Sequence, residues 1–212
     1  MSTVFDREPI VLNADMSTRW QGSSAPRGDD YDARWQKLAA EGRSVHGEAD
    51  LIEQLLKETG GTRVLDAGCG TGRVAIELAA RGFTAVGVDS DPGMLVAARA
   101  KAPELTWIEA DLSTLDAEDE FDTAVFDTAV LAGNVMIFVT PGTEEKVLHA
   151  VAARVTPGGL VVAGFSLRED RLQLEAYDRY AAAAGLQPVA RWATWDRAPF
   201  TGGDYAVSVH RR

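Results

Sequence analysis

Apolar positions along this chain follow two periods, and the two periods alternate. Short unbroken apolar runs predict buried β-strands, and longer segments with apolar residues three and four positions apart predict amphipathic helices. The predicted strands cover residues 63–66, 83–89, 105–109, 124–131 and 159–165. The predicted helices cover residues 29–42, 47–60, 74–80, a segment beginning at Asp91-Pro92, 143–155 and 170–184. Strands that alternate with helices in this way form a parallel sheet with helices on both faces, because the crossovers are right-handed.

The end of the chain departs from this alternation. Residues 187–195 and 204–210 both have the pattern of strands, and no helical segment separates them. Two neighbouring strands joined by a loop pair in antiparallel fashion. The sequence therefore predicts an α/β fold with a doubly wound, Rossmann-like, mostly parallel sheet that finishes in a C-terminal antiparallel hairpin.

Two further segments differ from the regular pattern. Residues 1–28 contain prolines and no sustained period, so we expect a weakly ordered N-terminal arm with a short extended piece near residues 10–12. The segment Phe-Asp-Thr-Ala-Val occurs twice in tandem, at 121–125 and 126–130. Because a five-residue shift turns a strand over, the two copies cannot have the same role. We expect the second copy to be the buried strand.

Composition and charge narrow the possible partners. The chain has 212 residues, which indicates one domain, and 46% of them are apolar. Its net charge of −11, from 21 basic and 32 acidic residues, disfavours nucleic acid and anionic membrane surfaces as partners. A single cysteine, Cys69, excludes an internal disulfide and a multi-cysteine metal site, and we expect no metal. No leader and no long apolar run is visible, so we expect a cytoplasmic protein.

The most informative segment is the turn after the first predicted strand, where glycines stand at positions 68, 70 and 72. Closely spaced glycines let the backbone approach a ligand where any Cβ would collide, and a plain strand-to-helix turn does not need three of them. A dinucleotide fingerprint has its third glycine three places after the second, whereas here the interval is two and Arg73 follows. The spacing therefore disfavours a nicotinamide or flavin dinucleotide.

Three acidic residues follow three successive predicted strands. Asp66 precedes the glycine turn, where it would repel a pyrophosphate but suits a cationic amino group. Asp89 lies 23 residues later (89 − 66), at the position where an acid meets a ribose diol in such sheets. Asp111 follows the third strand, where it can accept from an adenine amino group. Together the three acids suit a ligand with a cationic amino-acid part, a ribose and an adenine, and S-adenosylmethionine has all three.

The segments Asp66-Ala-Gly-Cys-Gly-Thr-Gly72, Gly87-Val-Asp89 and Ala110-Asp111-Leu112 resemble those of the class I S-adenosylmethionine-dependent methyltransferases. The resemblance covers about residues 29–212 and implies a seven-stranded sheet whose last strand is antiparallel, with helices in 29–60 capping the cleft. It implies that the residues that hold the cofactor are Asp66, Gly68, Cys69, Gly70, Asp89, Ser90, Met94, Ala110, Asp111 and Leu112, with Tyr31 and Trp35 as lid residues.

The resemblance also suggests where the chemistry takes place. Methyl transfer is an in-line displacement, and a base is needed only when the nucleophile must lose a proton. His46 lies in a segment that in this family commonly folds over the cofactor. Asn134 follows the fourth central strand, whose end faces the methyl group in this fold. We therefore name His46 and Asn134 as the candidate catalytic residues.

The predicted function is methyl transfer from S-adenosylmethionine to a small-molecule acceptor, with S-adenosylhomocysteine as the product. We expect a monomer or a homodimer. One alternative is a protein that binds S-adenosylmethionine but has lost or changed this activity. A second alternative, disfavoured by the glycine spacing, is an NAD(P)-dependent oxidoreductase.

Overall fold

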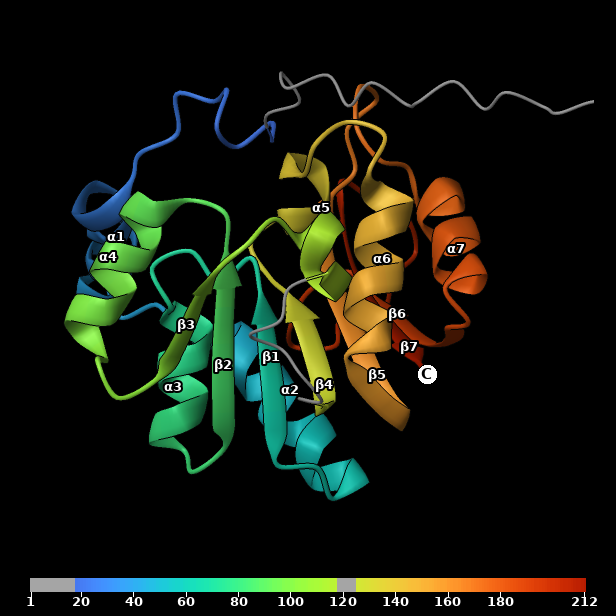
Figure 1. Ribbon diagram of the computed structural model, residues 1–212, viewed down its shortest axis with the longest axis horizontal. Helices are drawn as coiled ribbons and strands as arrows, with labels where there is room; N and C mark the ends of the chain where they lie inside the picture. The colour runs from blue at the N-terminus through green and yellow to red at the C-terminus, as the bar shows by residue number, and fades with distance from the viewer. Residues whose placement is uncertain (1–17, 118–124) are drawn as a thin grey trace, which may run out of the picture.

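A computed structural model describes residues 18–117 and 125–212, and its centre is a sheet of seven strands within these residues (Figure 1). The strands are β1 (Arg63–Ala67), β2 (Thr84–Asp89), β3 (Thr106–Glu109), β4 (Phe126–Leu131), β5 (Val155–Ser166), β6 (Gln187–Trp192) and β7 (Tyr205–Arg211). Their order across the sheet is β3-β2-β1-β4-β5-β7-β6. The strands β1 to β5 pair in parallel, and β7 is antiparallel to both of its neighbours. The predicted fold is confirmed.

The second strand of the C-terminal hairpin, β7, pairs with the parallel part of the sheet, and the first strand, β6, lies outside it. β7 pairs with β5 along seven residue pairs, and its five central residues are buried, whereas β6 lies at the edge and none of its residues is buried. A strand that is buried along its length is best stabilised with neighbours on both sides. Pro188 also suits an edge strand, because proline cannot donate to a second neighbour.

Helices cover both faces of the sheet (Figure 1). They are α1 (Gly28–Ala40), α2 (Gly47–Thr59), α3 (Arg73–Ala80), α4 (Pro92–Lys101), α5 (Val135–Phe138), α6 (Glu144–Ala153) and α7 (Leu174–Ala183), with a 3₁₀ helix at Leu112–Ala117. The apolar side chains of α2, α3 and α4 pack on one face, and those of α5, α6 and α7 pack on the other. Among the described residues, none of the helices combines the length and apolar character needed to cross a membrane.

The two helices expected to cap the cleft have different positions. α2 packs its buried Leu51, Ile52, Leu55 and Leu56 against the sheet, so it belongs to the core rather than to a cap. α1 has no fully buried residue and lies beside α4. The apolar residues of α2 form a stripe that packs on the strands. Burial of this stripe stabilises α2 more than an exposed position above the cleft would.

The arm and the repeat are only partly within the described residues. Residues 1–17, with the extended piece expected near 10–12, lie outside them, and so do 118–124. Thr18, the first described residue of the arm, is buried. The second copy of the repeat forms β4, and Phe126 and 128–130 are buried, so the prediction for that copy is confirmed. Val125, the one described residue of the first copy, is 41% exposed.

A buried tyrosine in α7 allows a test of the packing. The Tyr177 ring is fully buried between Phe165 and His210, with ring centroids 5.2 and 5.4 Å away. Its hydroxyl has no hydrogen-bond partner in the described part of the chain. Because a buried hydroxyl without a partner is unfavourable, Tyr177→Phe is expected to leave the free energy of unfolding unchanged or to raise it by up to about 1 kcal/mol. Urea unfolding measures this; a loss above 1 kcal/mol would show that the hydroxyl has a partner.

Candidate functional site

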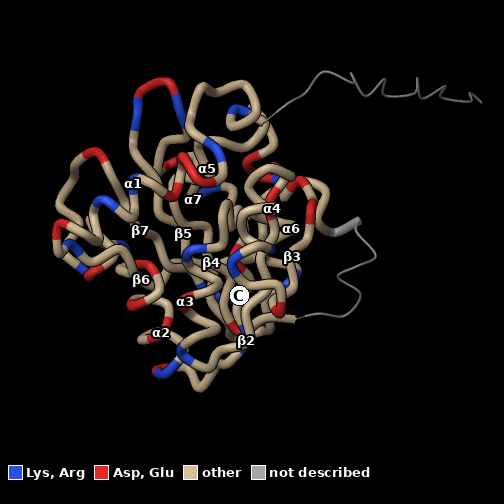
Figure 2. The backbone as a smooth tube through the Cα atoms, turned by 90° about the vertical axis from the view of Figure 1, so that its left-hand side faces the viewer, with Lys and Arg blue, Asp and Glu red and all other residues tan. Residues whose placement is uncertain are grey.

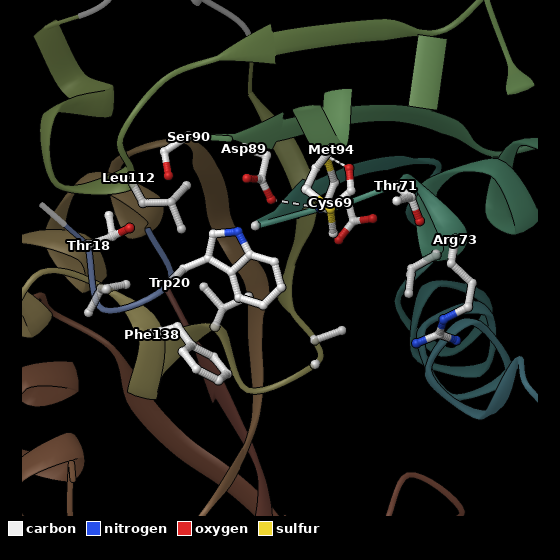
Figure 3. A pocket seen from close by; sticks show the side chains of 18 of the residues that line it. Thr18, Trp20, Cys69, Thr71, Arg73, Asp89, Ser90, Met94, Leu112 and Phe138 are labelled. Atoms are coloured by element: carbon white, nitrogen blue, oxygen red, sulfur yellow. Dashed lines mark hydrogen bonds between the residues drawn. The ribbon is translucent and has the colours of Figure 1, made fainter. Parts of the chain in front are cut away.

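A cleft opens where the parallel strands end, and it brings most of the predicted cofactor residues together (Figure 3). The predicted residues that line it are Tyr31, Asp66, Gly68, Cys69, Gly70, Asp89, Ser90, Met94, Ala110, Asp111 and Leu112. The other lining residues are Thr18, Trp20, Thr71, Arg73, Val74, Ala132, Gly133, Val135, Phe138 and Val139. The carboxyl ends of parallel strands are where sheets of this kind bind ligands.

The glycine turn between β1 and α3 has the backbone that its sequence predicts. Gly68, Gly70 and Gly72 have φ values of +81°, +55° and +83°, which lie in the left-handed region that favours glycine. A Cβ on Gly68 would lie 2.4 Å from Cγ2 of Val135. The N–H groups of Gly68 and Cys69 both donate to the carbonyl of Val88, at 2.8 and 2.9 Å. The turn is therefore fixed against β2, and its residues 68–71 line the cleft.

Asp66 lies at the end of β1 and is 1% exposed. Its Oδ2 accepts from the N–H of Ala75 in α3, at 3.0 Å. The pKa of Asp66 is raised to about 7, chiefly by burial; the N–H of Ala75 and the charge of Arg73 oppose this shift, and the charge of Asp89 adds to it. A cationic group placed beside Asp66 would favour its ionised form, so this carboxyl is suited to an ammonium ligand.

The raised pKa of Asp66 predicts a pH dependence of stability. Because the folded state holds the Asp66 proton more tightly than the unfolded state, whose pKa is 3.8, this group's contribution to stability is fully present below about pH 4. The contribution is lost as pH rises through about 7. Asp66→Asn keeps an acceptor for Ala75 but does not ionise, so its melting temperature relative to the parent should increase between about pH 4 and 7. A constant difference across that range would contradict the burial argument.

Asp89 ends β2 and connects two loops. Its Oδ2 accepts from the N–H of Gly70 at 2.7 Å, and its Oδ1 accepts from the N–H of Asp91 at 2.9 Å. Burial raises the pKa of Asp89 although these two N–H groups oppose the shift. Its carboxylate is thus held in one orientation at the edge of the cleft, between the glycine turn and the start of α4.

The third acid and its neighbours form the far end of the cleft. Asp111 Oδ1 accepts from the backbone N–H and the hydroxyl of Ser113, at 2.8 and 2.7 Å, so its side chain is fixed. Met94 is buried in α4, and its sulfur accepts from the N–H of Gly28 at 3.3 Å. Leu112 is buried beside them. This end offers apolar surface and one oriented carboxylate, which is the combination that a flat base with an amino group needs.

Three predicted residues do not line the cleft. His46 precedes α2, and its Nδ1 lies 3.4 Å from Oε2 of Glu77 on α3. Asn134 has φ +71°, and its Oδ1 accepts from the N–H of Ser166 at 2.7 Å, so its amide connects the start of α5 to β5. Trp35 contacts a lining residue instead of the cleft itself: the guanidinium of Arg73 lies 4.0 Å from the centroid of the Trp35 ring. The structure gives each of these side chains a contact with a neighbouring element.

The described end of the arm contributes residues that the sequence did not identify. Trp20 lines the cleft, and its indole N–H donates to Oδ2 of Asp91 at 2.8 Å. Arg27 donates to the same oxygen at 2.7 Å and lies over the Trp20 ring, 4.1 Å from its centroid. The acid before Pro92 predicted the helix start, and Asp91 does cap α4 through Gly93. Nothing in the sequence predicts that Oδ2 of Asp91 accepts hydrogen bonds from Trp20 and Arg27, which lie 71 and 64 positions earlier in the chain.

Arg73 was also not identified by the sequence as a site residue. It donates to both carboxylate oxygens of Glu48 on α2, at 3.0 and 2.6 Å, and to the carbonyl of Val45. This pair fixes the start of α3 against α2. Arg73 is the one basic side chain among the described lining residues, and its charge is neutralised by Glu48.

Comparison with known proteins gives consistent relatives. Residues 64–159 match a family model described as a methyltransferase domain. The crystal structure of a TehB-like SAM-dependent methyltransferase from Corynebacterium glutamicum is 32% identical, covers 87% of this chain and 97% of its own, and has a TM-score of 0.75.

Curated proteins with detectable similarity match over shorter segments. The glycine N-methyltransferase of Mus musculus is 33% identical over 143 residues, which are 60% of this chain and 48% of the mouse protein. The magnesium-protoporphyrin O-methyltransferase of Rhodobacter capsulatus is 36% identical over 136 residues, 59% of this chain and 60% of that protein. The chain thus spans about half the length of the curated relatives that it matches.

Proposed function

Because this chain belongs to the class I S-adenosylmethionine-dependent methyltransferases, we propose that it transfers the methyl group of that cofactor to a small-molecule acceptor. The observation that carries the proposal is the position of three carboxyl groups, on Asp66, Asp89 and Asp111, along one cleft beside the glycine turn. Family membership also disfavours the oxidoreductase alternative, as the glycine spacing does.

In the proposed site each part of the cleft holds one part of the cofactor. Asp66 and the glycine turn hold the methionine portion, with the carboxyl of Asp66 ionised against its amino group. Asp89 accepts from the ribose hydroxyls, and Met94, Leu112 and Asp111 surround the adenine. The bound cofactor supplies an activated methyl group on its sulfonium, so the protein contributes binding, orientation and the exclusion of water.

The catalytic assignments are revised by the positions of the side chains. The amide oxygen of Asn134 accepts from Ser166, so we propose that Asn134 positions the end of β4 and does not contact the acceptor. His46 lies beside Glu77, outside the lining of the cleft, and we assign it no role in the transfer. The proposed mechanism therefore depends on alignment of the acceptor with the methyl group.

The small-molecule acceptor is supported by the charge of the chain. Acidic residues exceed basic ones by 11 (32 − 21), and Figure 2 shows the two kinds interspersed along the described chain. Binding of a nucleic acid needs basic side chains that neutralise phosphates. The one basic side chain among the described residues that line the cleft, Arg73, is paired with Glu48.

Calorimetry and an acceptor screen test the proposal together. S-adenosylhomocysteine and NADH are titrated separately into the protein, and binding of S-adenosylhomocysteine alone is expected. A panel of amines, phenols, thiols and carboxylic acids is then incubated with S-adenosylmethionine, and release of S-adenosylhomocysteine is measured. Acceptor-dependent release by at least one class supports the proposal. Tight binding without release for any class would favour a protein that binds the cofactor but does not transfer its methyl group.

A further inference from the structure

Three aromatic rings from separate segments meet in one part of the cleft. The Trp20 ring lies 5.5 Å from the ring of Phe138 and 6.2 Å from that of Tyr31, at interplanar angles of 85° and 84°. All three residues line the cleft, and Val135 and Val139 line it as well. In Figure 3 the indole of Trp20 lies between Phe138 and the carboxyl of Asp89. The rings thus stand beside the region proposed to hold the ribose and the methionine portion.

Hydrogen bonds at two sides fix the position of Trp20. Its backbone N–H donates to the carbonyl of Phe138 at 3.1 Å, and its indole N–H donates to Asp91 at 2.8 Å. The guanidinium of Arg27 lies 4.1 Å from the ring centroid and is paired with Asp91 at 2.7 Å. Because both donors of Trp20 already have acceptors, the surface that the indole gives to the cleft is carbon. A ring fixed in this way offers a flat apolar wall at little cost in conformational entropy.

The basic side chains near this wall are already paired. Arg73, the one basic residue among the described lining residues, lies 2.6 Å from Glu48, and Arg27 behind Trp20 is bound to Asp91. The lining carboxyl groups on Asp66, Asp89 and Asp111 are those proposed to hold the cofactor. An anionic acceptor would lose water here without gaining a counter-ion from the described lining residues, which is costly.

The hydroxyl of Tyr31, on α1, reaches the end of β4 in the cleft. It lies 3.9 Å from the position that a Cβ on Gly133 would occupy, at the end of β4. Burial raises the pKa of Tyr31, so the hydroxyl stays protonated at neutral pH. A protonated phenol orients a neutral atom by a hydrogen bond, but it does not act as a base. The nucleophile that fits this position therefore has its lone pair available without losing a proton.

We propose that Trp20, Tyr31 and Phe138 form the acceptor subsite and that it takes a flat, uncharged aromatic amine. The inference rests on the proposed function. In the transfer the nitrogen lone pair forms a bond to the methyl carbon, the sulfur–methyl bond breaks, and its electron pair stays on sulfur. The N-methylanilinium product then releases its proton to water, since such ammonium groups are acidic. Aliphatic amines are protonated at neutral pH, so they lack both the lone pair and the neutral charge.

Two isomers test the substrate class directly. 4-Methylaniline is an uncharged aromatic amine at pH 7.5, and benzylamine has the same composition and ring but is protonated; benzoate is the anionic control. 4-Methylaniline is expected to release S-adenosylhomocysteine with a kcat/KM at least tenfold above the other two. Equal or better use of benzylamine or benzoate would overturn the inference. So would an absence of both reaction and binding of 4-methylaniline to the S-adenosylhomocysteine-loaded protein. Binding of S-adenosylhomocysteine in that titration reports separately on the proposed function.

Variants of Trp20 separate an acceptor wall from a part of the cofactor site. Trp20→Ala is expected to raise the KM or Kd for 4-methylaniline about tenfold, and Trp20→Phe about threefold, because each removes part of the flat surface. Affinity for S-adenosylhomocysteine should change less than twofold. Trp192→Phe, in the edge strand β6 outside the cleft lining, is the matched control and should change neither quantity. An unchanged acceptor affinity in Trp20→Ala, or an equal loss for S-adenosylhomocysteine, would overturn the inference.

Discussion

Replacement of Asp89 by alanine is expected to weaken the binding of S-adenosylhomocysteine about 100-fold. In the proposed site its carboxylate accepts from two ribose hydroxyls, and hydrogen bonds to a charged group contribute about 1.5–3 kcal/mol each. The same carboxylate accepts from the N–H groups of Gly70 and Asp91, so the variant also loosens the glycine turn. Isothermal calorimetry with the parent and variant proteins measures the change.

Asp89→Asn separates the two causes. Asparagine keeps one acceptor oxygen for a backbone N–H but loses the charge and the second acceptor, so an intermediate loss of about tenfold is expected. Asp89→Asn should retain the melting temperature of the parent to within a few degrees, whereas Asp89→Ala should lower it further, because the N–H groups of Gly70 and Asp91 lose their acceptor. Parental affinity in Asp89→Ala would show that the ribose is held elsewhere.

Replacement of Gly72 by alanine is expected to lower the free energy of unfolding by about 3 kcal/mol or more. Gly72 has φ +83°, and a Cβ there would lie 2.4 Å from Cη2 of Trp107. The indole cannot easily move away, since it is 8% exposed and its N–H donates to the carbonyl of Ala102 at 2.8 Å. The variant therefore combines an unfavourable backbone conformation with a collision in the core.

Gly82→Ala is the matched control. Gly82 has φ +91°, but apart from its chain neighbours no atom of the described residues lies within 4 Å of its Cβ position, so this variant has the backbone cost alone, about 1–2 kcal/mol. Chemical denaturation of both variants should give a difference of at least about 1 kcal/mol, with Gly72→Ala the less stable protein. Equal losses would show that Trp107 adjusts without cost.

Local patterns were enough to predict the central architecture. The apolar runs of β1, β2 and β5 are short and bounded by glycines or acids, and the intervening helices have clear end signals such as Asp91-Pro92. The α/β alternation and the terminal hairpin follow from these local signals because connection rules leave few topologies. The short helix α5 and the 3₁₀ helix at Leu112–Ala117 were not predicted, since segments of four to six residues have too little periodicity to be recognised.

The site was predictable where it follows the strand ends. Asp66 and Asp89 lie at the ends of β1 and β2, Asp111 follows β3, and parallel strands align their carboxyl ends at one edge of the sheet. The neighbours of a residue cannot be predicted in this way where its position depends on contacts distant in sequence. Trp35 and His46 have the residue types of a site, but their neighbours, Arg73 and Glu77, are set by the packing of α1 and α2 against α3.

The sequence by itself determined the order of strands and helices, the glycine turn and the three acids, because each depends on residues close together in the chain. Only the tertiary structure decided that β7 lies between β5 and β6, that α2 covers the sheet, and that Trp20 reaches the cleft. These features depend on which apolar surfaces bury each other and on single contacts such as Trp20 with Asp91. Contacts of this kind join residues far apart in the chain, so no local pattern contains them.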